Sequence, residues 1–239
     1  MRLRQITFTG VDAGTDIRKL MEIQKDFPIV EFGVLASYHW KENGNRYLDP
    51  SLFESLVGLE HLSLHLCGTA AVDAARGNWS RIYEYTRGFL PIFDRIQLNL
   101  SRSRNAPDYV AVPILGRQEV IIQQRDAESR TLYDNTLRQW PGVDNFSMLL
   151  DASGGKGVDT QVVVFPSERK IGYAGGISPD NVGAKLAYLL RNVRSGTFWI
   201  DMETGVRTGD WFDVDKVRQV LSVCSEEIYE FELNNHLND

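Results

Sequence analysis

Short apolar blocks recur along the whole chain, and each is followed by a segment that can form a helix. Alternation of strand and helix patterns is typical of a parallel α/β fold. Eight such repeats close a barrel, so we predict a (β/α)8 TIM barrel in which residues 1–239 form a single domain. The predicted strands are Gln5–Thr9, Val30–Ala36, Leu62–Cys67, Arg95–Leu100, Glu119–Gln123, Ser147–Asp151, Lys170–Ala174 and Phe198–Met202.

Polar and apolar side chains alternate within several of these strands. In the first strand, Ile6 and Phe8 point to one face while Thr7 and Thr9 point to the other. In a barrel the apolar set faces the outer helices and the polar set faces the interior or its mouth. A polar lining is costly without partners, so it indicates a mouth that faces a ligand. The predicted inner set includes His65, Cys67, Asp151 and Asp201, with Glu203 near the rim.

Helix patterns are clearest at Thr15–Lys25, Asn181–Val193 and Asp213–Cys224. We expect Asp16 to cap the first of these helices and Asp213 to cap the last, because a carboxylate at the N-cap accepts from free backbone N–H groups.

Two other segments break the pattern with Arg, Asn, Pro and Gly, namely Gly68–Pro91 and Ser101–Arg117. We interpret Ser101–Arg117 as a long loop after the fourth strand and predict that it folds over the site.

Three segments in the second half share one design, an apolar run that ends in glycine and polar residues. Such a run is typical of a buried parallel strand followed by a turn before a helix. In the second segment, Ser178 is the expected N-cap and Pro179 the expected first helical residue. Gly175 and Gly176 would then lie at the positive end of a helix dipole, where a phosphate is stabilised. The three segments are Phe146–Gly157, Lys170–Asn181 and Thr197–Gly209.

Composition narrows the class of protein. With 239 residues, 43% hydrophobic and 24% charged, the chain suits one globular barrel. It lacks an apolar run of about 18 residues, and its start lacks the pattern of a signal peptide, so we expect a cytoplasmic protein that does not act at a membrane. The charge of -6 argues against a nucleic-acid partner. Cys67 and Cys224 lie far apart without metal-ligand spacing, so we expect neither a metal nor a disulfide framework.

The three glycine segments, taken together and in order, resemble the last three strands of phosphoribosylanthranilate isomerase, a barrel of the tryptophan pathway. Phe8–Val11 and Asn45–Pro50 resemble the first half of that family more weakly. The strongest elements are Leu149–Asp151 before Gly154–Gly157, Ala174–Val182, and Asp201 with Thr204–Val206.

The resemblance implies an Amadori rearrangement, in which an aldose-derived aminosugar phosphate becomes a 1-amino-ketose phosphate. The family uses an aspartate as general acid where Asp151 stands, and a cysteine as general base at the end of the first strand. This chain has Thr9 at that position. An alkyl hydroxyl ionises far too weakly to serve as that base. The reaction needs only an acid and a base, so no cofactor is implied.

Three interpretations of Thr9 stay open. Another inward group, namely His65, Cys67 or Glu203, could supply the base. The protein could act as another sugar-phosphate isomerase, epimerase or aldolase, although Lys170 lies at the wrong end of its strand to form a Schiff base. It could also be a barrel that binds a phosphorylated ligand without catalysis, because a shared fold does not fix chemistry.

The candidate site follows from these patterns. We predict a small phosphorylated substrate, and the sequence leaves a homo-oligomer open. For the glycines the alternative is plain turn geometry, and for Arg46 it is a solvated loop cation. Structural roles are the alternative for His65 and Cys67. The candidate catalytic positions are Asp151, Thr9, His65 and Cys67; the candidate binding positions are Arg46, Gly154, Gly155, Gly175, Gly176, Asp201, Thr204 and Gly205.

Overall fold

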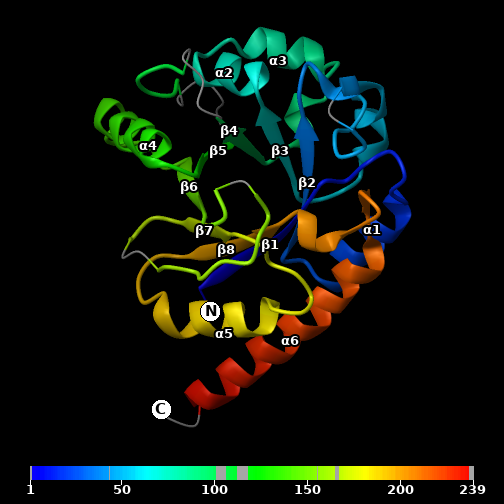
Figure 1. Cartoon of the computed structure of the whole chain (residues 1–239), viewed down its shortest axis with the longest axis vertical. Coiled ribbons are helices and arrows are strands. Elements are labelled where there is room, and N and C mark those ends of the chain that lie inside the picture. Colours follow the sequence, from blue (N-terminus) through cyan, green and yellow to red (C-terminus); the bar gives the residue numbers. More distant parts are fainter. Residues whose placement is uncertain are drawn as a thin grey trace.

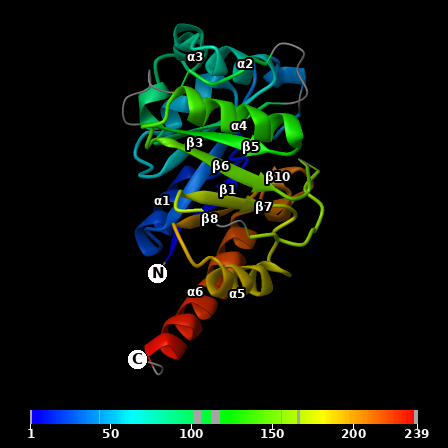
Figure 2. The ribbon, with the colours of Figure 1, turned by 90° about the vertical axis from the view of Figure 1, so that its left-hand side faces the viewer.

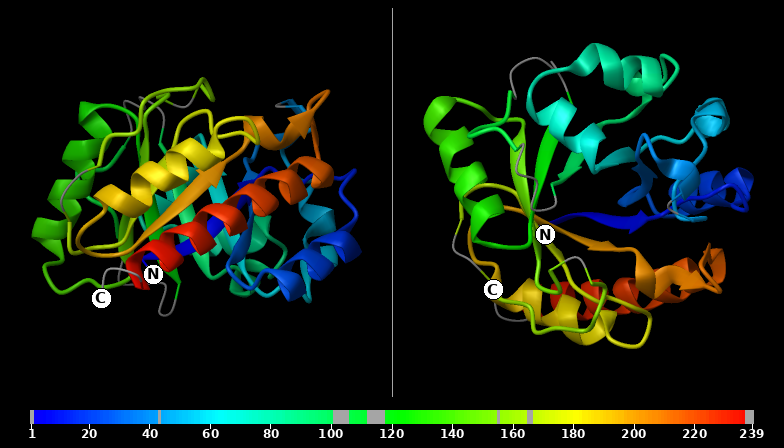
Figure 3. Two further views of the ribbon diagram at one scale, coloured as in Figure 1. Left: turned by 90° about the horizontal axis from the view of Figure 1, so that it is seen from below. Right: turned by 45° about the horizontal axis from the view of Figure 1, so that its top comes forward.

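The computed structural model describes residues 2–42, 44–100, 106–111, 118–154, 156–164 and 167–236. Eight parallel strands form a closed barrel in sequence order, with β8 paired to β1, and helices lie outside the strands (Figure 3). The predicted (β/α)8 barrel is confirmed. Its strands are β1 (Leu3–Thr9), β2 (Val30–Ala36), β3 (Leu62–Cys67), β4 (Arg95–Asn99), β5 (Glu119–Gln124), β6 (Phe146–Asp151), β7 (Ile171–Ala174) and β8 (Phe198–Met202).

The outer elements follow the strands in turn (Figure 1). Asp16 caps α1 by accepting from the backbone N–H of Arg18, and Asp213 accepts from the backbone N–H groups of the first turn of α6, as predicted. The helices are α1 (Ile17–Asp26), α2 (Thr69–Ala75), α3 (Trp79–Tyr85), α4 (Ala127–Gln139), α5 (Val182–Asn192) and α6 (Val214–His236), with 3-10 turns at Trp40–Glu42, Pro50–Leu56, Leu90–Ile92 and Thr204–Val206.

Several details differ from the predictions, and α6 continues to His236, beyond the predicted end at Cys224. Gly68–Pro91, which interrupts the sequence pattern, forms α2 and α3. A 3-10 turn at Pro50–Leu56 replaces a helix after β2, and the described residues between β6 and β7 contain no helix.

The predicted start of α5 is wrong by three residues. Ser178 and Pro179 lie in a turn, and α5 begins at Val182, because the Asn181 side chain accepts from the backbone N–H of Ser178 and closes the turn before the helix.

The alternation of side chains places the core outside the strands. The outward residues of β2, for example, are all buried beneath the outer layer: Val30, Phe32, Val34 and Ala36. A smaller apolar cluster of Ile121, Leu149 and Trp199 fills the barrel interior. The strands are thus apolar on the side that faces the helices, whereas the barrel interior is apolar only in part.

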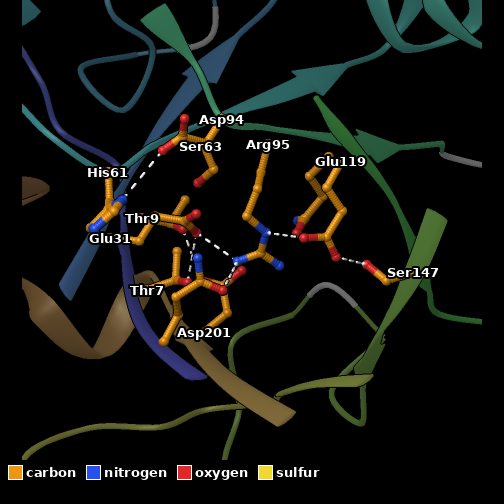
Figure 4. A network of polar contacts seen from close by, with 12 residues as sticks. Thr7, Thr9, Glu31, His61, Ser63, Asp94, Arg95, Glu119, Ser147 and Asp201 are labelled. Atoms are coloured by element: carbon orange, nitrogen blue, oxygen red, sulfur yellow. Dashed lines mark hydrogen bonds and ion pairs between the residues drawn. The ribbon is translucent and has the colours of Figure 1, made fainter. Parts of the chain in front are cut away.

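Below the mouth, the interior also contains a charged layer (Figure 4). Arg95 is 2% exposed and its Nη1 lies 2.9 Å from Glu31 Oε1, while its Nε lies 3.3 Å from Glu119 Oε2. Lys170 Nζ also binds Glu119, at 2.9 Å. The Arg95 guanidinium lies 4.2 Å from the ring centre of Trp199. Lys170 therefore forms an ion pair at the amino ends of the strands, far from the mouth. This agrees with the prediction that it lies at the wrong end of its strand to form a Schiff base.

The last helix completes the outer layer. α5 and α6 pack side by side, and the C-terminal part of α6 runs beyond the barrel (Figures 1 and 2). None of the helices in the described part of the chain is both long and apolar enough to cross a bilayer. The predicted loop over the site, Ser101–Arg117, lies largely outside the described residues, which include only residues 106–111 of it.

Candidate active site

A cavity of about 420 Å³ opens at the carboxyl ends of the strands. The loops that follow β6, β7 and β8 form part of its wall, as the glycine segments predict. Gly154 lies in an exposed turn outside this lining, and Gly155 lies outside the described residues. The other candidate residues line it together: Thr9, Arg46, His65, Cys67, Asp151, Gly175, Gly176, Asp201, Thr204 and Gly205.

Asp151 occupies the end of β6 and is 9% exposed. Its Oδ1 accepts from the backbone N–H of Ser153 at 3.0 Å and from the Ser153 hydroxyl at 2.6 Å. Its Oδ2 accepts from Gln123 Nε2 at 2.7 Å. These contacts fix the carboxyl group from both sides. Asp151 also lines the cavity.

The loops after β7 and β8 touch each other through their backbones. A Cβ added to Gly205 would overlap the carbonyl oxygen of Ile177, so only glycine allows this approach. Gly176 adopts a φ of +60°, and a Cβ there would overlap the backbone of Val158 in the loop after β6. Three loops therefore interlock around one corner of the cavity. Both glycines are thus required by contact between these loops, and both also line the cavity.

Replacing Gly205 by Ala is expected to weaken the binding of inorganic phosphate by about 10–100-fold. The new methyl group must push the β7 and β8 loops apart, and the loss of one charge-assisted hydrogen bond corresponds to this range. Titration calorimetry with phosphate measures the effect. Gly142→Ala is the control, because a Cβ at Gly142 meets no atom within 4 Å. Wild-type phosphate affinity in the Gly205 variant would contradict the assignment.

Arg46 reaches the rim of the cavity from the segment after β2. Its Nη1 lies 3.0 Å from Glu203 Oε1 and its Nε lies 2.7 Å from Asp210 Oδ1, with 37% of the side chain exposed. The guanidinium is therefore paired rather than purely solvated. A substrate carboxylate would share this cation with Glu203 and Asp210, or displace one of them.

Thr9 and Asp201 meet in the wall of the cavity, although they are 192 residues apart in the sequence. The Thr9 hydroxyl donates to Asp201 Oδ1 at 2.7 Å. Burial raises the pKa of Asp201 from its ordinary value to about 7; Glu31 and Glu203 add to the effect, while the Thr9 hydrogen bond and Arg95 oppose it. Asp201 is thus set to exchange a proton near neutral pH, which sequence reasoning missed because the shift depends on burial.

His65 and Cys67 also lie in the inner wall on β3, as predicted. His65 has Ser63 Oγ at 3.0 Å from one ring nitrogen and Gln97 Nε2 at 3.1 Å from the other. Burial, together with Arg95, lowers the pKa of His65 to about 3. Burial raises the pKa of the Cys67 thiol. Neither group is therefore a strong proton acceptor at neutral pH.

Several further residues of the cavity wall were not among the predicted site residues. The sequence pattern could have identified Gln97, Asn99 and Gln123, because each is a polar residue on the inward face near the end of its strand. Arg125 and Lys156 add positive charge to the lining, which suits an anionic ligand. Within the described part of the chain, no group of three or more His, Cys, Asp and Glu side chains is arranged to hold a metal ion.

A closed parallel barrel with a polar, partly cationic cavity at the carboxyl ends of its strands defines a TIM barrel whose cavity opens at the face where many enzymes carry their active sites. The sequence model of the family described as N-(5'phosphoribosyl)anthranilate (PRA) isomerase matches residues 96–223, more than half of the chain. The chain belongs to this family and is a phosphoribosylanthranilate isomerase-like protein.

Solved structures agree on the fold. N-(5'-phosphoribosyl)anthranilate isomerase from Pyrococcus furiosus superposes with a TM-score of 0.53 at 12% identity, covering 93% of this chain and 98% of the other. A truncated 3-deoxy-D-arabino-heptulosonate 7-phosphate synthase from Thermotoga maritima superposes with a TM-score of 0.51 at 12% identity, covering 96% and 88%. A search of curated protein sequences finds no match.

Proposed function

We propose that the protein catalyses an Amadori-type isomerisation of a phosphorylated aminosugar, with N-(5-phosphoribosyl)anthranilate as the first candidate substrate. The observation that carries this proposal is the placement of Asp151 and the interlocked glycine loops on one cavity. The Asp151 carboxyl group thus faces the same cavity as the glycine-rich loops, whose backbone would hold the phosphate. Family membership supports the same reaction.

The chemistry requires a general acid and a general base. Asp151 donates a proton to the ring oxygen of the sugar, the bond between that oxygen and C1 breaks, and an iminium forms between C1 and the nitrogen. A base then removes the proton from C2, which gives an enolamine. Ketonisation of the enolamine adds a proton to C1 and releases one from the C2 oxygen. The phosphate, held by the loops at Gly176 and Gly205, keeps C1 and C2 in place during both steps.

The remaining polar groups fit the rest of such a substrate. Arg46 at the rim offers a guanidinium for a carboxylate. Arg125 and Lys156 in the lining offset the charge of a phosphate.

A turnover assay on freshly generated N-(5-phosphoribosyl)anthranilate tests the proposal. The aldosyl substrate and the ketosyl product are isomers, so they are separated by chromatography and quantified over time. Formation of the ketose above the uncatalysed rate supports the function. If the protein binds inorganic phosphate but forms no ketose, it is a ligand-binding barrel or an enzyme for a different sugar phosphate.

A further inference from the structure

The position that the family resemblance assigns to the base is occupied by Thr9, whose hydroxyl is a hydrogen-bond donor in this structure. Its partner is a carboxylate at the end of the neighbouring strand, Asp201 on β8. Thr9 is 2% exposed and Asp201 is 4% exposed, and both line the cavity. Figure 4 shows the two side chains facing each other across the β1 and β8 junction. A carboxyl group therefore lies next to the position where the base is needed.

The hydrogen bond from Thr9 uses one of the two carboxylate oxygens of Asp201. Thr9 Oγ1 binds Oδ1, and the described residues provide no other hydrogen-bond donor to Asp201. A Cβ at Gly33 would crowd Thr9 Oγ1, so the absence of a side chain on β2 gives the threonine room for this rotamer. Thr9 thus orients the carboxylate, and Oδ2 is free to accept a proton from a ligand in the cavity.

The surroundings of Asp201 suit this role. Glu31 on β2 and Glu203 at the end of β8 disfavour its charge, and Arg95 on β4 favours it, but burial dominates and brings the pKa to about 7. His65 on β3 is neutral in this range because its pKa lies at about 3. A general base works best when its pKa lies near the working pH, since a substantial fraction of the group is then ionised and still accepts a proton readily.

The other candidate bases are less suited. Cys67 keeps its proton, because burial raises the pKa of the thiol. Burial raises the pKa of Glu203, but its ion pair with Arg46 at 3.0 Å opposes this rise and holds its carboxylate on the cation at the rim. The nitrogens of His65 are both occupied, by Ser63 and Gln97.

We propose that Asp201 is the general base that removes the C2 proton of the substrate, and that Thr9 is a positioning residue that holds Asp201 for this step. The proposal rests on the proposed function and assigns the base that Thr9 cannot provide.

The proton balance closes over one turnover. Asp151 gives one proton to the ring oxygen, and the ring C–O bond breaks. Asp201 takes one proton from C2, and the electron pair of that C–H bond forms the C1–C2 double bond as the iminium nitrogen becomes neutral. Ketonisation moves one proton onto C1 and one off the C2 oxygen. Solvent then returns a proton from Asp201 to Asp151, so both carboxyl groups regain their starting states without a further reactant.

The first test compares wild-type protein with Asp201→Asn on N-(5-phosphoribosyl)anthranilate. We expect kcat to fall by about 10²–10⁴-fold, the range of a lost general base. Substrate deuterated at C2 is expected to show a larger isotope effect in the variant, because the C2 step becomes slower. Asp94→Asn is the matched control, since Asp94 precedes β4 at the opposite end of the barrel and its side chain is 56% exposed.

The positioning role of Thr9 is tested by the pH dependence of kcat/KM in two variants of this residue. Thr9→Ser keeps the hydroxyl and is expected to retain the wild-type pH profile. Thr9→Val removes the hydrogen bond that lowers the pKa of Asp201, so the rise of kcat/KM with pH should move to higher pH. A purely structural role for Thr9 would lower activity in both variants and leave the midpoint of that rise unchanged.

A measurement without substrate checks that the variant folds and that Asp201 holds a proton. The folded protein holds this proton up to about pH 7, whereas the unfolded chain releases it near the ordinary value of 3.8. Asp201 therefore favours folding less and less as the pH rises from about 4 to 7. Relative to wild type, Asp201→Asn should gain thermal stability over this interval.

The outcomes separate the two proposals. A wild-type protein without turnover would refute the proposed function and the role of Asp201 with it. Turnover that survives in Asp201→Asn would refute the role of Asp201 alone. Loss of the C2 step in Glu203→Gln, with normal turnover in Asp201→Asn, would transfer the role of base to Glu203. Higher KM with unchanged kcat in Asp201→Asn would show that Asp201 only binds substrate.

Discussion

Asp151→Asn is expected to lower kcat by about 10²–10⁴-fold on N-(5-phosphoribosyl)anthranilate, because the amide cannot donate the proton that opens the sugar ring. The amide oxygen can still accept from the backbone N–H and the hydroxyl of Ser153, so the loop after β6 keeps its anchor. The amide NH2 would meet the NH2 group of Gln123, which can turn its own oxygen toward it. The substitution thus removes the proton and preserves the shape.

Steady-state kinetics and phosphate binding together test this expectation. Inorganic phosphate should bind to Asp151→Asn as it does to wild type, since the glycine loops are unchanged. Asp144→Asn is the matched control, because Asp144 is an exposed residue just before β6, at the other end of the same strand. A value of kcat within about threefold of wild type would exclude Asp151 as the acid, because general acid catalysis contributes far more than this.

Arg207→Leu is expected to lower the free energy of unfolding by about 3–5 kcal/mol, the usual cost of removing one partner from a buried ion pair. Arg207 is 3% exposed, and its Nη2 lies 3.0 Å from Asp12 Oδ2, whose side chain is fully buried. Its Nη1 donates to the carbonyl oxygen of Gly10 at 2.6 Å. The arginine therefore ties the segment after β1 to the hairpin of β9 (Arg207–Thr208) and β10 (Trp211–Phe212), next to the cavity.

Urea unfolding at neutral pH, extrapolated to water, measures the change. Arg218→Leu is the control, because Arg218 is 43% exposed and lies 3.6 Å from Glu22 at the surface, where a pair contributes only about 0–1 kcal/mol. Arg207→Lys should recover only part of the loss, since an ammonium lacks the planar fork that reaches both Gly10 and Asp12. Equal stability of the Arg207 and Arg218 variants would contradict the structural role of this pair.

The sequence by itself determined the barrel and the face of the barrel at which the cavity opens. Strands such as Val30–Ala36 and Phe198–Met202 have the same bounds in the prediction and in the structure. A buried strand needs a local run of apolar residues, and such a run is visible in the sequence. The glycine segments after β6, β7 and β8 likewise follow from local backbone requirements. Parallel strands bring their carboxyl ends to one face, so these segments had to meet there.

Local patterns were less informative where a polar side chain could either form a specific hydrogen bond or ion pair or face the solvent. Ser178 has the residue type of an N-cap, but Asn181 closes the turn and the helix begins at Val182. Arg46 could be a solvated cation by sequence alone, and the structure pairs it with Glu203 and Asp210, which lie more than 150 residues further along the chain. The sequence does not record which of these competing hydrogen bonds forms.

Only the tertiary structure decided which ionisable groups lie together and how their pKa values shift. Thr9 and Asp201 are separated by 192 residues, and their hydrogen bond exists because β1 and β8 are adjacent when the barrel closes. The pKa of about 7 for Asp201 arises chiefly from burial, and that of about 3 for His65 has the same main cause. The energy of a charge depends on the solvent and charges around it, and these are set by the packed barrel rather than by the neighbouring residues in the chain.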